Sequence, residues 1–199
     1  LGGEKMRKIN NITIIRIVII RAALIFLIAI FTQCSNRHLV KGIIYETEFQ
    51  FDEAIKEYEK GGNSIIVLNK IATLYNKTGK RDKAVEVLKR ILEIDKDNIE
   101  AHFDLAGTYY ALGRFEDAIR KYELVLKLNP LSVASLNGLG NIHYDQRKTD
   151  KAIEFYKRAI AINPNFAPVY NDLGNAYHSQ GKIKEAIIEY KKALSLDVN

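Results

Sequence analysis

Histidine and cysteine are the side chains in this 199-residue sequence best suited to bind a metal ion or to act as a nucleophile. There is one cysteine, Cys34, and there are four histidines: His38, His102, His143 and His178. The histidines show no short ligand spacing, and a single cysteine provides neither a disulfide within the chain nor a cysteine-based metal site. We therefore expect no metal site and no cofactor.

Cys34 stands just after an unbroken apolar run of ten residues, Ala22–Phe31, which follows a positively charged start. Ten residues are too few to cross a bilayer, which needs about 20, but they match the core of a secretory signal peptide. The segment Phe31-Thr32-Gln33-Cys34 resembles the lipobox of bacterial lipoproteins. It departs from that pattern at Gln33, where a small residue is usual, and at Phe31, where leucine is usual.

The lipobox resemblance implies that the signal is cleaved before Cys34 and that its thiol is acylated, which would hold the protein on a membrane. Residues 1–34 are thus expected to be a signal peptide or membrane anchor that starts at Leu1 or at Met6. An uncleaved anchor, an ordinary signal peptide and a coincidental free cysteine are the alternatives. The expected location is the bacterial cell envelope, with the cytoplasmic membrane as the alternative.

The basic balance of the sequence belongs mainly to this first segment. The whole chain carries a net charge of +6. Residues 1–33 carry five basic residues and one acidic residue, whereas residues 34–199 carry 25 basic and 23 acidic residues. A nucleic-acid-binding domain would show a basic stripe within its folded part, so we expect no nucleic-acid partner.

The rest of the sequence repeats with a period of 34 residues. Ala84, Ala118, Ala152 and Ala186 are each 34 residues apart, and Ala54 lies 30 residues before the first of them. Other positions keep the same step: the pairs Leu105-Ala106, Leu139-Gly140 and Leu173-Gly174, the tyrosines Tyr122, Tyr156 and Tyr190, and the prolines Pro130 and Pro164. Such a period is typical of stacked structural repeats.

These residues resemble the tetratricopeptide repeat, a helix–turn–helix unit of 34 residues. The resemblance implies an all-α, right-handed superhelical solenoid of antiparallel helix pairs after the N-terminal segment. The expected units are a degenerate first repeat at residues 35–64 and full repeats at residues 65–98, 99–132, 133–166 and 167–199. Departures from the pattern include His143, which replaces a core tyrosine and which we interpret as a packed structural histidine.

The physical properties of the residues indicate the same architecture. In the third unit, Leu105 and Tyr109 lie at helical spacing in a first helix, and Tyr122 and Leu126 do so in a second. Gly79 and Gly113 are placed to end first helices in a left-handed conformation. One such helix pair cannot bury its own apolar face, so neighbouring pairs must stack to share one core.

In the family, the first helix of each unit lines a concave groove that binds peptides or partner helices. Carried over to this sequence, the resemblance predicts that one face of each first helix contacts a partner. The residues are Asn69, Thr73, Phe103, Tyr110, Asn137, Asn141, Tyr144, Asn171, Asn175 and His178. Amides could hydrogen-bond an extended ligand, although asparagine at these sites could also serve only to solvate the surface.

We expect the chain to be a scaffold or adaptor that binds a protein or peptide, with its N-terminal segment on a membrane. A membrane-tethered or soluble cytoplasmic co-chaperone-like adaptor is the alternative. Asp104, Asp145 and Asp172 oppose a clamp for a C-terminal carboxylate. We expect no enzyme activity, because almost every residue after position 34 has a place in a repeat. Ile187, Tyr190 and Leu194 predict an apolar face at the C-terminal end, available for self-association.

Overall fold

The computed structural model describes residues 37–196, and within that range it contains helices and no strand. The expectations for residues 1–34, including the lipobox-like cysteine, lie outside the described part. The helices are a segment over residues 37–47, α2 (Phe51–Lys60), α3 (Ile65–Lys77), α4 (Arg81–Ile94), α5 (Ile99–Ala111), α6 (Phe115–Leu128), α7 (Val133–Asp145), α8 (Thr149–Ile162), α9 (Ala167–Ser179) and α10 (Ile183–Leu196).

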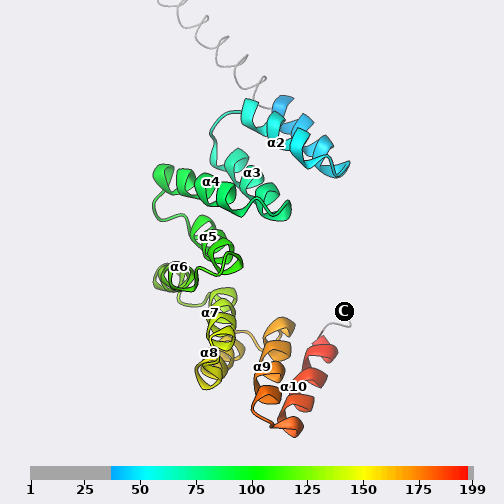
Figure 1. Ribbon diagram of the computed structural model, residues 1–199, viewed down its shortest axis with the longest axis vertical. Coiled ribbons are helices and arrows are strands. Elements are labelled where there is room, and N and C mark those ends of the chain that lie inside the picture. The colour runs from blue at the N-terminus through cyan, green and yellow to red at the C-terminus, as the bar shows by residue number, and fades with distance from the viewer. Residues whose placement is uncertain (1–36, 197–199) are drawn as a thin grey trace, which may run out of the picture. The chain divides into compact units, whose positions relative to one another are not determined.

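The described residues divide into two compact units: unit 1 ends at Ile71 and unit 2 begins at Ala72, so the boundary lies inside α3. In the second unit each helix from α4 to α10 packs against the next one along the chain, as Figure 1 shows. Contacts also join α5 to α7 and α7 to α9. The all-helical prediction is therefore confirmed for the described residues, and so is the packing of neighbouring helices in pairs.

The helix starts reproduce the 34-residue period of the sequence. The first helices of successive pairs begin at Ile65, Ile99, Val133 and Ala167, and the second helices begin at Arg81, Phe115, Thr149 and Ile183. Acidic residues lie in the first turn of each of these second helices, where the helix dipole favours negative charge. A recurring local sequence thus produces a recurring local structure.

The turn after each first helix has one residue in the left-handed conformation. Gly79 (φ 75°), Gly113 (φ 72°) and Gly181 (φ 74°) occupy this position, and Arg147 (φ 63°) occupies it in the remaining full repeat. The following amide then bonds back to the helix, as in Arg114 N to Tyr109 O at 2.9 Å. The prediction that Gly79 and Gly113 end first helices in this conformation is confirmed.

Tyrosines of the second helices pack across small residues of the first helices. The Tyr156 ring, 1% exposed, lies against the backbone of Gly140, where a Cβ atom would overlap it. A Cβ on Gly174 would come within 2.5 Å of Tyr190 Cε1. The close crossing of the two helices therefore requires a small residue at this position, as the repeat pattern indicates.

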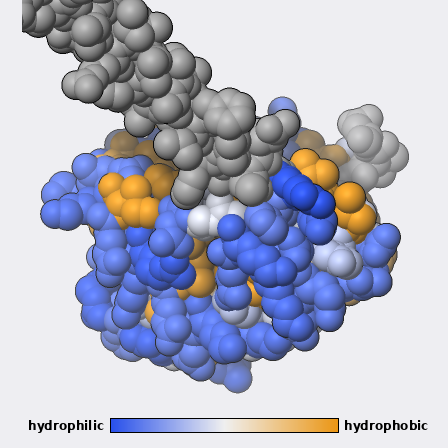
Figure 2. Space-filling model, turned by 90° about the horizontal axis from the view of Figure 1, so that it is seen from above, coloured by the Kyte–Doolittle hydropathy of each residue, from blue (hydrophilic) through white to orange (hydrophobic). Residues whose placement is uncertain are grey.

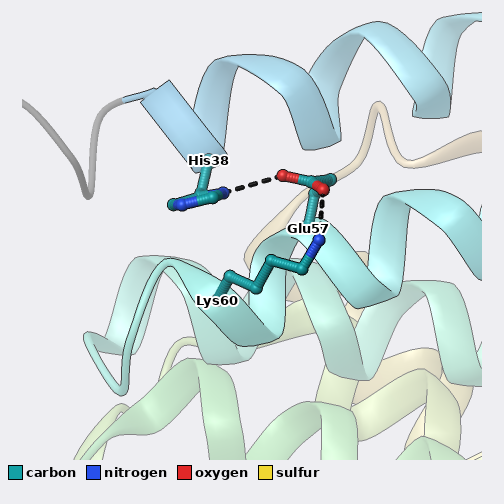
Figure 3. Close-up of polar contacts among 3 residues, drawn as sticks. All are labelled: His38, Glu57 and Lys60. Carbon is teal, nitrogen blue, oxygen red and sulfur yellow. Dashed lines mark hydrogen bonds and ion pairs between the residues drawn. The ribbon is translucent and has the colours of Figure 1, made fainter.

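Unit 1 contains the same arrangement in shortened form. Its helical segment at residues 37–47 places Gly42 against the buried ring of Tyr58 in α2. Figure 3 shows a second contact between these helices, in which His38 Nδ1 lies 2.7 Å from Glu57 Oε2. Within α2, Lys60 Nζ lies 2.6 Å from Glu57 Oε1. The hydrogen bond from Lys60, followed by that from His38, lowers the pKa of Glu57 to about 2.

Apolar side chains are buried between the helices and polar side chains dominate the outside. Figure 2 shows mostly hydrophilic residues on the face in view, with separate hydrophobic patches. One core cluster joins Leu136 of α7, Tyr156 of α8 and Leu173 of α9. Among residues 37–196, no helix combines the length and hydrophobicity that crossing a membrane requires.

Candidate protein-binding groove

Side chains of three first helices, α5, α7 and α9, meet each other across neighbouring repeats. Tyr110 OH donates a hydrogen bond of 2.6 Å to Asp145 Oδ2. Asn137 Nδ2 donates one of 3.0 Å to Asp172 Oδ2. Both pairs are 35 residues apart, so each bond links one repeat to the next along the same face.

Between these helices lies a cavity of about 190 Å³. Helix α5 contributes one residue to its lining, α7 three, α8 one and α9 two. They are Tyr110, Asn141, Tyr144, Asp145, Tyr156, Asp172 and Asn175. Four of the residues predicted to contact a partner, Tyr110, Asn141, Tyr144 and Asn175, are thus brought together at one place.

The two asparagines of this cavity are held by tyrosines of the second helices. Tyr156 OH donates a hydrogen bond of 2.7 Å to Asn141 Oδ1, and Tyr190 OH donates one of 2.8 Å to Asn175 Oδ1. Each amide oxygen is therefore engaged within the protein, and each Nδ2 group is oriented by that bond. Asn141 also has a hydrogen bond to Asp172.

Partial burial controls the electrostatics of this face. It raises the pKa of Asp172, while the hydrogen bonds from Asn137 and Asn141 act in the opposite direction. Burial, with a smaller contribution from Glu100, also raises the pKa of Asp104 to about 6. The pKa of Tyr110 is raised by burial and then by its bond to Asp145. The face therefore holds carboxylates whose charged form is incompletely stabilised by the protein itself.

The other residues predicted to contact a partner lie elsewhere. Phe103 packs edge-on against the Tyr122 ring at 5.6 Å, and Asn171 lines a larger cavity of about 480 Å³ between α9 and α10. Thr73 and His178 are exposed, and Asn69 belongs to unit 1. Asn137 lies beside the smaller cavity through its bond to Asp172.

Sequence reasoning did not identify Asp145, Asp172 and Tyr156 as members of this site. The two aspartates were considered only as groups that oppose binding of a carboxylate. The sequence did contain a sign of their role, because the first helices carry acidic residues on this face without a matching set of basic residues. The ring of Tyr156 is buried, but its hydroxyl donates a hydrogen bond to Asn141 Oδ1 and so reaches the cavity.

The histidines of the described part are structural or exposed. His143 is 5% exposed and stacks on Phe155 at 5.4 Å, which confirms its interpretation as a packed histidine. Burial lowers its pKa. His102 Nε2 lies 2.9 Å from the carbonyl oxygen of Lys96. Within residues 37–196, no three His, Cys, Asp or Glu side chains are grouped so that they could hold a metal ion.

The regular packing of each helix against the next defines a helical-repeat protein. Tetratricopeptide repeat family models match residues 75–139 and 167–199, and a TPR repeat model matches residues 140–181. No curated protein matches the sequence. The chain belongs to the tetratricopeptide repeat family.

Solved structures of MamA resemble this chain. The match with one of them has 28% sequence identity and a TM-score of 0.69, and it spans 83% of this chain and 92% of the MamA chain. The match with another has 30% identity and a TM-score of 0.67, and it spans 78% of this chain and 94% of that MamA chain. A MamA RS-1 double mutant, at 16% identity and a TM-score of 0.70, is similar in fold. The family and these similarities support a role in protein–protein interaction.

Proposed function

We propose that the chain is a scaffold that binds a peptide or helix of a partner protein along α5, α7 and α9. The observation that carries this proposal is the convergence of Tyr110, Asn141, Tyr144 and Asn175 on one cavity between repeats. The phenol rings offer flat apolar surface, and the oriented amide groups offer donors to a partner backbone. The described face supplies binding groups and no arrangement of nucleophile and base.

A bulky substitution in the cavity tests this binding site. Asn175 is exposed, so Asn175→Arg should block the cavity. The substitution removes the bond from the half-buried Tyr190 OH but touches no fully buried side chain of the core. Glu154→Arg, at an exposed position on the second helix α8, is the matched control. In pull-downs from the source cell with the full-length chain, we expect partner recovery to fall at least about tenfold for Asn175→Arg only. Equal recovery by both variants would exclude the groove.

We also propose that Cys34 is acylated and that the lipid holds the scaffold in the bacterial cell envelope. The support is the apolar run followed by a cysteine in the sequence. Mass spectrometry of the mature N-terminus, combined with membrane fractionation, should find an acylated Cys34. Cys34→Ser should remove the lipid and release the protein from the membrane fraction. An unprocessed N-terminus would favour the alternative, an adaptor tethered to the cytoplasmic membrane.

The exposed apolar face of α10 supports a further contact, between two copies of the chain. Ile187 and Leu194 are 46% and 66% exposed, whereas Ile153, at the position equivalent to Ile187 in the preceding repeat, is 8% exposed. Covering this face in a dimer would remove apolar surface from water. Light scattering at tens of micromolar should show a dimer that Leu194→Glu dissociates. A wild-type monomer at that concentration would exclude this contact.

A further inference from the structure

We propose that the cavity between α5, α7 and α9 receives a lysine or arginine side chain of the bound partner. This inference rests on the proposed function and specifies the chemistry of the partner. Its geometrical basis is a side-chain-sized space whose walls carry two carboxylates, three phenols and two amides. The lining contains no lysine, arginine or histidine.

The charges of the cavity are unbalanced within the described protein. No ion pair joins Asp145 or Asp172 to a basic side chain of residues 37–196. Their partners are neutral donors: Tyr110 for Asp145, and Asn137 and Asn141 for Asp172. A carboxylate accepts up to about four hydrogen bonds, so both groups keep acceptor capacity for a cationic ligand.

Burial makes this lack of a cation costly. Asp172 has a raised pKa because its charged form is partly withdrawn from water. An ammonium or guanidinium group in the cavity would stabilise that charged form, as opposite charges at close range do. An acidic partner group would instead be repelled by both aspartates, which argues against a carboxylate ligand at this point.

Size and ring chemistry also favour one cationic side chain. The cavity holds about 190 Å³, which is less than the roughly 300–1,000 Å³ of sites for whole small molecules. Tyr110 and Tyr144 add aromatic rings to the lining, and such rings attract cations through their electron-rich faces. The planar guanidinium of arginine could bond to a carboxylate through two parallel hydrogen bonds.

Peptide selection tests the inference. A displayed library of random peptides of about twelve residues is selected on the full-length chain in a non-ionic detergent. Selected peptides are synthesised with their lysine or arginine intact or replaced by glutamine, and affinities are measured by fluorescence anisotropy. The protein variants are the double variant Asp145→Asn/Asp172→Asn and a control at an exposed loop residue, Asp97→Asn.

We expect the selected peptides to share a basic residue whose replacement by glutamine weakens binding at least about tenfold, as loss of a charge-assisted hydrogen bond does. The double variant should lose the same factor, and Asp97→Asn should lose none. The glutamine peptides need no change in the protein, so the result does not depend on the folding of a variant.

Two other outcomes separate this inference from the proposed function. Peptides that Asn175→Arg displaces, but that bind equally with glutamine in place of the basic residue, would overturn the cationic ligand and leave the groove intact. Peptides that Asn175→Arg does not displace would place binding outside the groove and overturn both. Selection of no binding peptide would also count against both.

Discussion

Tyr110 of α5 donates a hydrogen bond to Asp145 of α7, and this 2.6 Å contact joins two repeats through residues that also line the cavity. The groups that a partner would contact are therefore also groups that hold one repeat against the next. Binding at the cavity should strengthen the stacking, because a ligand that binds only the folded protein stabilises it.

Gly140 should not tolerate a side chain. In Gly140→Ala the added Cβ overlaps the ring of Tyr156, which is 1% exposed and cannot move into solvent. We expect a loss of about 1–3 kcal/mol in the free energy of unfolding. Gly107→Ala is the control, because its Cβ would lie 3.7 Å from Tyr122 Oη. That variant should be neutral or up to about 1 kcal/mol more stable. Equal urea midpoints would contradict the close-crossing argument.

Arg147→Gly should stabilise the protein. Arg147 occupies the left-handed position (φ 63°) that glycine fills in the neighbouring repeats. An L-residue in this conformation costs about 1–2 kcal/mol. The greater freedom of glycine in the unfolded chain offsets about 0.5–1 kcal/mol of the stability that the substitution gains. We expect a gain of about 0.5–1 kcal/mol by urea unfolding. Gly113→Ala should lose a similar amount, and unchanged stability of both variants would show that the turn is not strained.

Asp104→Asn should stabilise the fold at neutral pH but not in acid. Burial raises the pKa of Asp104 to about 6, above its unfolded value of about 4. The wild type therefore loses stability as pH rises from about 4 to about 6, and the penalty persists above that range. We expect a gain of about 2 kcal/mol at pH 7.5 that disappears at pH 4. Asp97→Asn, at an exposed loop residue, is the control and should leave the free energy of unfolding unchanged.

Glu57→Gln should weaken unit 1 at mild pH. The contacts with Lys60 and His38 lower the pKa of Glu57 to about 2, so their stabilisation is present above about pH 4.5 and is lost as pH falls towards 2. Hydrogen exchange of the α2 amides should be faster in the variant than in the wild type at pH 6. The difference should vanish near pH 2. The exposed control Glu48→Gln should exchange like the wild type.

The repeat period made most of the fold predictable. Regular spacing of Ala118, Ala152 and Ala186 reflects one packing geometry repeated along the chain, so local sequence determines local structure. Arg147 escaped the prediction because it adopts the glycine conformation without being glycine. The boundary between the two compact units, which lies inside α3, is also not visible in the 34-residue period of the sequence.

The candidate site was predictable only in part. Residues four apart, such as Asn141 and Asp145, must share a helix face, so the sequence could place them together. It could not show that Asn171 and Asn175, also four apart, line two different cavities. Nor could it show that Tyr156 OH would reach Asn141, because that bond depends on how far a core ring extends between helices.

Site-specific photo-crosslinking in the source cell tests the central claim most directly. A benzoylphenylalanine is placed at His178, exposed on the first helix α9, or at Glu154, exposed on the second helix α8. The groove account predicts a discrete crosslinked partner from position 178 that Asn175→Arg abolishes, and none from position 154. A partner captured from position 154 alone, and unaffected by Asn175→Arg, would contradict it.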